Sequence, residues 1–330
     1  MPFLDQAPCF WIKAKLHDME YFRYNDSCMF SRIMNESKIL QHSGSNRIVH
    51  TYGWTKWMNA MALIMEYMPG GNLAYIIFCD AIELHPSLIM RFCYEIADGM
   101  VYLHQTFGGK RSWIHGNLRP SKVLLDKDLH CKIGNFGVVT SMKRSGYTVS
   151  SSVISEGDSQ TASLYLAPER LMKKPIRPTK QQDTYSFGLI IHGLLSREAP
   201  DQFFPSRTEY LNAVSAGKRP DTAAIQLLKD KPGSSLCEAL ESIMTQCWAQ
   251  DPTIRPAMSK VREQLLQIVF KMKQSEIEIS AAKVAEQLPM VVSTLKDNTS
   301  SALLSSYNPK MKRFSAGIVY FVINKQEIKG

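Results

Sequence analysis

The spacing of hydrophobic residues divides the chain into a short β-rich part and a longer helical part. Residues 10–12 and 60–67 are short apolar runs with the residue types that favour strands. Between them, apolar residues of 30–41 recur at helical spacing and predict one helix. The glycine-rich run 69–72 predicts a turn, in which Asn72 is a candidate cap for the next helix.

From residue 73 onward the pattern becomes mostly helical. Apolar residues of 88–104 recur with a period near 3.6, which is typical of a half-buried helix. Further helices are predicted over 183–195, 206–216, 236–248 and 256–272, and 264–288 is predicted as one long, partly amphipathic helix. A small β-rich part followed by a larger helical part is typical of α+β proteins with two lobes that share a cleft.

Composition excludes global disorder and favours anionic partners. The 330 residues are 45% hydrophobic and 21% charged, which is enough to bury a core. The net charge of +9 favours nucleotide phosphates, acidic proteins or anionic lipid. No zinc finger, arginine-rich arm or aromatic RNA-binding signature accompanies that charge, so nucleic acid is not a predicted partner.

Cysteine usage and the chain ends predict a cytoplasmic protein. The seven cysteines are scattered without a C-x-x-C pair, which favours reduced, mostly buried thiols over disulfides or a metal site. The first residues lack the basic and apolar regions of a signal peptide. The longest late apolar stretch, 317–323, is far shorter than the roughly 20 residues that cross a bilayer, so no transmembrane segment is predicted.

Candidate chemistry lies at landmarks that follow one another in a fixed order. They are a strand lysine, Lys13, a helical acid, Glu36, and the motifs HGNLRPSK at 115–122, NFG at 135–137 and APE at 167–169. Each is weak alone, because a lone lysine is usually solvated and a loop histidine is usually a packed polar residue. Their shared order and spacing argue against chance.

On these residues the chain resembles the protein kinase fold, and within it the tyrosine-kinase-like group, over about residues 10–268. The hinge-like MEYMPGGNL at 65–73 and DTYSFG at 183–188 fit that family, and CWAQDPTIRP at 247–256 is the most specific match. The hinge and 124–133 most resemble receptor-interacting kinases, with mixed-lineage-kinase-like pseudokinases as neighbours. The resemblance implies a bilobal α+β fold, with ATP and Mg²⁺ as the family's cofactors.

The resemblance also predicts the domain organisation. Residues 1–68 are expected to form a truncated kinase N-lobe, 69–268 the C-lobe, 269–297 a C-terminal helix and 298–330 a disordered tail. Only 12 residues, without a glycine, precede Lys13, whereas the family places two strands and a glycine-rich loop there. We therefore expect the small sheet to lack an edge partner and the nucleotide to lack its lid.

All three reaction-centre positions depart from the family pattern. The proton-accepting aspartate falls on Asn117, the metal-binding asparagine on Lys122 and the metal-binding aspartate on Asn135, while Gly116 replaces an arginine. A neutral amide cannot act as a general base. Lys122 would repel Mg²⁺, which prefers charged oxygens, although a lysine can contact phosphate as a point charge.

The nucleotide-binding positions are better kept. By resemblance, Lys13 pairs with Glu36, with Lys15 as a rival for the lysine role, and the backbone of Glu66 to Met68 contacts adenine. The alternative interpretation is that these residues are core packing retained from the fold. Segment 138–164, rich in serine and threonine, is either a phosphoacceptor loop or a solvated loop.

The fold-supporting positions are kept as well. By resemblance, Asp183 anchors the loop that begins at His115, and Glu169 pairs with Arg255. Retained supports around a changed reaction centre predict a pseudokinase that acts as a signalling scaffold or allosteric partner, with weak, metal-independent or no ATP binding and no Mg²⁺. Its expected partners are other signalling proteins or kinases. The alternatives are an active ATP-dependent Ser/Thr kinase with an atypical site, or a truncated product that does not fold alone.

Overall fold

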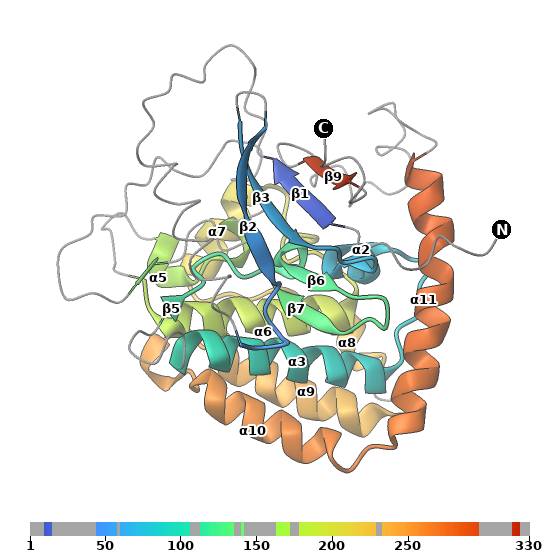
Figure 1. The fold of residues 1–330 in the computed structure, drawn as a ribbon. Helices are drawn as coiled ribbons and strands as arrows, with labels where there is room; N and C mark the ends of the chain where they lie inside the picture. Colours follow the sequence, from blue (N-terminus) through green and yellow to red (C-terminus); the bar gives the residue numbers. More distant parts are fainter. Residues whose placement is uncertain are drawn as a thin grey trace.

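A small antiparallel sheet lies above a larger helical part, as the hydrophobic pattern predicts (Figure 1). This arrangement is seen in a computed structural model, which describes residues 10–14, 44–57, 60–105, 113–134, 140–141, 163–171, 178–228, 233–296 and 319–323. The predicted two-lobed α+β organisation is confirmed. The helix predicted over 30–41 lies outside the described residues.

The small sheet has the strand order β2-β3-β1-β9. Its strands are β2 Thr51–Trp57, β3 Ala60–Glu66, β1 Phe10–Ala14 and β9 Val319–Ile323, and each neighbouring pair is antiparallel. The expectation that this sheet lacks an edge partner is wrong for β1, because β9 pairs with its outer edge. The predicted tail 298–330 did not anticipate this strand, although VYFVI is rich in β-branched and aromatic residues.

The larger part is built from helices and two small sheets. Among the described residues, the helices are α2 Leu73–Phe78, α3 Pro86–Gln105, α5 Pro168–Leu171, α6 Lys180–Ser196, α7 Arg207–Ser215, α8 Ala223–Gln226, α9 Ser234–Cys247, α10 Met258–Val269 and α11 Gln274–Lys296, with 3-10 turns η2 Pro120–Lys122, η3 Ser163–Tyr165 and η4 Pro252–Ile254. The small sheets pair β4 Gly71–Asn72, β6 Val123–Leu125 and β7 Cys131–Ile133, and β5 Trp113–Ile114 with β8 Thr140–Ser141. The helices predicted over 88–104, 183–195, 206–216 and 236–248 are confirmed to within a few residues.

The cap predicted at the start of α2 is present. Asn72 Oδ1 accepts a hydrogen bond from the Ala74 N–H at 3.1 Å, which satisfies one of the amides left free at a helix start. By contrast, the single helix predicted over 264–288 is wrong. The chain turns after Val269 and starts α11 at Gln274, and α11 then runs along the side of the helical layer (Figure 1).

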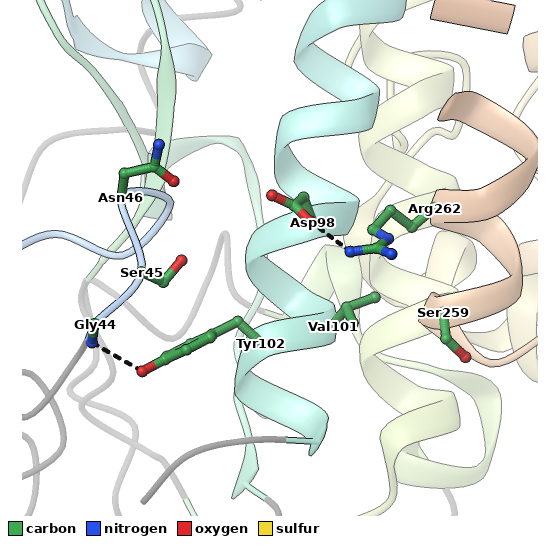
Figure 2. A pocket seen from close by; sticks show the side chains of 8 residues that line it. All are labelled: Gly44, Ser45, Asn46, Asp98, Val101, Tyr102, Ser259 and Arg262. Atoms are coloured by element: carbon green, nitrogen blue, oxygen red, sulfur yellow. Dashed lines mark hydrogen bonds and ion pairs between the residues drawn. The ribbon is translucent and has the colours of Figure 1, made fainter. Parts of the chain in front are cut away.

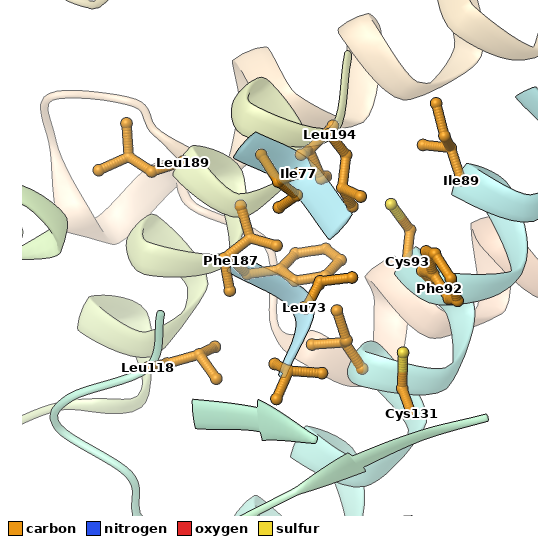
Figure 3. Close-up of a cluster of buried hydrophobic side chains, with 14 of the residues drawn as sticks. Leu73, Ile77, Ile89, Phe92, Cys93, Leu118, Cys131, Phe187, Leu189 and Leu194 are labelled. Atoms are coloured by element: carbon orange, nitrogen blue, oxygen red, sulfur yellow. The ribbon is translucent and has the colours of Figure 1, made fainter. Parts of the chain in front are cut away.

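The core lies in the helical part and centres on α6. From Gln182 to Ser196 every residue of α6 is buried, so this helix is surrounded by protein on all sides. Figure 3 shows Phe187 and Leu194 of α6 among side chains of α2 and α3, including Leu73, Ile77 and Phe92. Because it is buried on all sides, α6 gives rigid support to the loop at 115–122, which contacts its first turn.

A short segment before β2 ties the small sheet to the helical part. Ile48 forms a parallel bridge with Ile133 of β7. The Val49 N–H donates to the Ile133 carbonyl at 2.9 Å, and the Ile133 N–H donates to the Arg47 carbonyl at 2.8 Å. The small sheet is therefore joined by backbone hydrogen bonds to the strand that leads to residue 135.

Glu95 of α3 makes further polar contacts with the residues of this junction. Its side chain is 2% exposed, and its oxygens lie 2.9 Å from Arg47 Nη1 and 2.6 Å from His130 Nδ1. The Cys131 N–H donates to Glu95 Oε2 at 2.7 Å. A buried carboxylate needs such partners, and here they fix the start of β7 against α3.

The predicted burial of the thiols is confirmed for the cysteines that the structure describes. Cys79, Cys93, Cys131, Cys237 and Cys247 are all free and buried. Burial raises the pKa of the Cys131 thiol well above its usual range, as expected for thiols that stay protonated in a core. Across the described part of the chain, no helix is both long and apolar enough to cross a membrane.

Candidate functional site

The loop at 115–122 is held in place by a single buried carboxylate, Asp183 in the first turn of α6. The His115 N–H donates to Asp183 Oδ2 and the Gly116 N–H donates to Asp183 Oδ1, each at 2.8 Å. His104 Nε2 of α3 lies 2.8 Å from the same Oδ2, and Asp183 is 1% exposed. The role that the resemblance gives to Asp183, anchoring this loop, is therefore seen in the structure. The third partner, His104, was not predicted.

Gly116 adopts a backbone conformation that other residues avoid. Its φ is +70°, in the left-handed region where a Cβ meets the following carbonyl oxygen. By the resemblance Gly116 replaces an arginine, and the structure gives this glycine a second role. Glycine relieves the strain of this turn between two amides that bind Asp183.

We expect Gly116→Ala to lower the free energy of unfolding by about 1–2 kcal/mol, because alanine pays the left-handed penalty. Urea titration followed by circular dichroism measures this. Gly44→Ala is the matched control, since Gly44 is exposed, is not left-handed, and its added Cβ would lie 3.8 Å from the Tyr102 hydroxyl. Equal stability of the Gly116 variant and the parent chain would contradict the assignment of strain.

The reacting positions that the structure describes are Asn117 and Lys122. Asn117 is half-buried, and its N–H donates to His115 Nδ1 at 3.2 Å. Lys122 is 3% exposed, and its carbonyl accepts from the Gly134 N–H at 3.0 Å. Lys122 is thus joined to the residue directly before Asn135, although Asn135 itself lies outside the described residues.

The described loop does not fit a magnesium ion. From His115 to Leu125 the sequence contains no aspartate or glutamate, and the two described reacting positions supply a neutral amide and a cation. Among the described residues, no group of three or more histidine, cysteine, aspartate or glutamate side chains could hold a metal. Mg²⁺ requires oxygen ligands, preferably carboxylates or phosphates, which the side chains of this loop do not supply.

Sequence reasoning missed a second buried cation in this loop, Arg119. It is 3% exposed, and its charge acts on Tyr165 of η3. Burial raises the pKa of Tyr165, and the nearby Arg119 guanidinium partly opposes that rise. The loop therefore contains two buried cations, Arg119 and Lys122. The surroundings that bury Arg119 could not be inferred from the loop sequence alone.

The hinge residues lie where β3 leaves the small sheet. Met65 and Met68 are buried, at 2% and 1% exposed. Glu66 is half-buried, and its carboxylate accepts from Lys132 Nζ at 2.7 and 2.9 Å. The Glu66 N–H donates to the His50 carbonyl at 3.0 Å. The predicted adenine contacts of Glu66 and Met68 stay predictions.

The remaining predicted binding residues belong to the N-terminal part of the chain, of which the structure describes residues 10–14. Lys13 belongs to β1, directly opposite Leu63 of β3 and Tyr320 of β9. The side chain of Lys13, and all of Lys15 and Glu36, lie outside the described residues. The predicted ion pair between Lys13 and Glu36 is therefore untested.

The second anchor predicted from the resemblance is present. Arg255 Nη1 lies 2.8 Å from Glu169 Oε1, and Nη2 lies 2.9 Å from Oε2, which is a bidentate pair. Arg255 also lies 5.0 Å from the ring of Tyr185 on α6. Burial raises the pKa of Tyr185 to about 12. The pair joins α5 to the residue that follows η4, and Arg255 Nη1 also donates to the Gln181 carbonyl of α6 at 3.2 Å.

A separate pocket of about 570 Å³ lies between the 44–46 turn, α3 and α10 (Figure 2). Its charged side chains, Asp98 and Arg262, face each other with Oδ1 and Nη1 3.0 Å apart. Of the described residues that line it, none comes from the 115–122 loop. Because its charges neutralise each other, we assign this pocket no chemistry.

Comparison with known proteins agrees with the motifs. A family model described as protein tyrosine and serine/threonine kinase matches residues 22–265. The chain is 25% identical over 253 residues to receptor-interacting serine/threonine-protein kinase 1 of Homo sapiens, covering 74% of this chain and 36% of that protein. It is 30% identical over 228 residues to receptor-interacting serine/threonine-protein kinase 3 of Rattus norvegicus, covering 69% and 45%.

A third relative is named for ankyrin repeats as well as for a protein kinase domain. The chain is 26% identical over 277 residues to ankyrin repeat and protein kinase domain-containing protein 1 of Homo sapiens, covering 84% of this chain and 33% of that protein. The resemblance to receptor-interacting kinases that the hinge indicated is confirmed by these matches. The chain spans less than half the length of each of these three relatives.

Proposed function

The chain belongs to the protein tyrosine and serine/threonine kinase family, and on that premise we propose that it is a pseudokinase with little or no phosphotransfer activity. One observation carries the proposal. The loop at 115–122 is fully formed and anchored by Asp183, yet it presents Asn117 and buried Lys122 at the reacting positions. Because the backbone of the loop is anchored, the expected loss of activity comes from the side chains at these positions and not from a displaced loop.

The chemistry of these side chains accounts for the expected loss. Phosphoryl transfer depends on positioning, on metal ions that neutralise phosphate charge, and on a carboxylate that takes the hydroxyl proton. Asn117 cannot take that proton, and losing a general base costs typically about 10²–10⁴-fold in rate. Lys122 brings a positive charge to the place of a metal ligand, which opposes Mg²⁺ binding.

We further propose that any nucleotide binds weakly and without metal. Support comes from the charge of the 115–122 loop, which carries Arg119 and Lys122 and no acidic residue, since local positive charge attracts phosphate. The hinge and the lysine of β1 would supply the other contacts by family resemblance. In this proposal the protein acts in the cytoplasm as a scaffold or allosteric partner of other signalling proteins or kinases.

The first test compares ATP turnover and ATP binding with and without Mg²⁺ on the purified chain. We expect no transfer of radiolabelled phosphate above background, and a thermal shift with ATP that Mg²⁺ does not increase. Lys13→Met and Lys15→Met form a matched pair that identifies the phosphate-contacting lysine. Mg²⁺-dependent phosphate transfer that Lys13→Met abolishes would instead support an active kinase with an atypical site.

A gain-of-function variant tests the same proposal in the opposite direction. Lys122→Asn combined with Asn135→Asp restores the two metal ligands of the family pattern. We expect this variant to acquire a Mg²⁺-dependent thermal shift with ATP that the parent chain lacks. If the parent already shows that shift, the side chains at 122 and 135 are not what limits metal binding.

A further inference from the structure

The edge of β1 that faces away from β3 is paired along its full length by a segment from the far end of the chain. β9 runs antiparallel to β1, with Phe10 opposite Ile323 and Ala14 opposite Val319. The other side of the same five β1 residues pairs with β3. Within the described part of the sheet, β1 is an interior strand only because 319–323 supplies its second neighbour.

The sequence of β9 suits this position. VYFVI consists of β-branched and aromatic residues without charge, glycine or proline, which are the residue types that favour a paired strand. The same sequence left unpaired would be an uncharged apolar strand with open hydrogen-bonding groups, which proteins avoid. Residues 297–318 allow the connection, since at about 3.3 Å per residue they can span roughly 70 Å from the end of α11.

We propose that the outer edge of β1 is a docking site for a β-strand and that Val319–Ile323 of the same chain is its occupant. The strand docks by β-augmentation, in which main-chain hydrogen bonds supply the binding energy and the register selects the segment. This proposal concerns the sheet itself and does not depend on nucleotide binding or on loss of catalysis.

The docking couples the C-terminal segment to the strand that carries Lys13. Lys13 is the fourth residue of β1 and is opposite Tyr320. When β9 leaves, β1 becomes an edge strand that is held only by β3. Such a strand loses hydrogen-exchange protection, because local opening is easiest where few neighbours hold the backbone. Residues 319–323 would thereby control how well the lysine strand is ordered.

Truncation tests the proposal, with hydrogen exchange of the 10–14 peptide as the readout. A chain ending after Ile318 lacks β9, and a chain ending after Ile323 is the matched control that keeps it. We expect at least tenfold faster exchange at 10–14 in the shorter chain only, with α6 equally protected in both. Equal protection of 10–14 in both chains would overturn the proposal.

Two single substitutions in the full chain serve if the shorter chain fails to fold. Successive amides of a strand point to opposite sides, so only one of the Tyr320 and Phe321 amides can donate to β1. Proline removes that donor, and it is tolerated where the amide faces away from the sheet. We expect Tyr320→Pro and Phe321→Pro to differ, one exposing 10–14 to exchange and the other not. Full protection in both variants would overturn the proposal.

Adding the strand back in trans distinguishes a docking site from a general effect of truncation. A synthetic peptide of residues 317–325 should restore protection of 10–14 in the chain ending after Ile318. The same peptide should fail to do so when it carries whichever of Tyr320→Pro and Phe321→Pro exposes 10–14 in the full chain. Failure of the unmodified peptide while α6 stays protected would overturn the docking site. In the full chain, protection that falls on dilution would show that the strand comes from a second copy, and would overturn docking within one chain.

Discussion

Replacing Asp183 by alanine is expected to lower the free energy of unfolding by about 3–5 kcal/mol and to release the 115–122 loop. The carboxylate is 1% exposed and has three donors, the His115 N–H, the Gly116 N–H and His104 Nε2, each at 2.8 Å. Alanine leaves all three polar groups without this acceptor, and His104 and His115 are buried. The cost of leaving buried donors unsatisfied exceeds the net value of the bonds themselves, which makes the effect large.

The matched control is Asp126→Ala. Asp126 Oδ1 also accepts two backbone amides, those of Asp128 at 2.9 Å and His130 at 2.8 Å, but it lies in a half-exposed turn. Water can replace it there, so we expect a loss of only about 1 kcal/mol. Urea titration gives both values, and hydrogen exchange at 114–118 reports loop release. Equal losses in the two variants would mean that burial of Asp183 adds nothing.

The anchoring role of Asp183 was predictable from sequence, and its complete environment was not. A local motif such as DTYSFG identifies the residue, but the third partner, His104, comes from the end of α3 and is separated from Asp183 by 79 residues. The same limit applies to Arg119, whose burial and electrostatic effect on Tyr165 of η3 cannot be read from the loop sequence. A local motif identifies a functional residue, whereas the partners of that residue depend on the long-range fold.

The break between α10 and α11 was readable from the sequence but was missed. Leu265 is buried on α10 and Ile277 on α11, and these positions are separated by about 3.3 turns of an ideal helix. One continuous helix would therefore point them about 120° apart, so they could not share one buried face. Two helices with their own buried faces resolve this conflict, and the shift in hydrophobic phase was the available signal.

The length of β9 excludes a membrane span but does not exclude a strand. Five apolar residues are too few for a bilayer but are an ordinary length for a strand. The sequence alone does not reveal which segment pairs with β9, because the pairing with β1 joins segments about 300 residues apart. An unpaired edge of β1 would leave main-chain hydrogen-bonding groups open, and β9 from the other end of the chain pairs with that edge.

Replacing Arg255 by methionine is expected to cost a similar amount, about 3–5 kcal/mol, because it breaks a buried ion pair from one side. Glu169, which is 8% exposed, would keep its charge without a partner. Arg255 also donates to the carbonyls of Ala249 at 2.8 Å, Gln181 at 3.2 Å and Gln250 at 3.1 Å. Arg255→Lys should recover little, because a point charge cannot replace the five-donor fork.

The double variant Glu169→Leu with Arg255→Met separates the two contributions of Arg255. Replacing both members of a buried ion pair by apolar residues is often neutral, because the cost of desolvating two charges disappears with their attraction. Arg255 also serves backbone carbonyls beyond Glu169, so we expect the double variant to stay destabilised by about 1–3 kcal/mol. Urea titration of both single variants and the double variant gives the coupling energy. Full recovery of parental stability would mean that Arg255 does no more than neutralise Glu169, whereas a persistent loss identifies it as the tie between α5, α6 and the turn after α9.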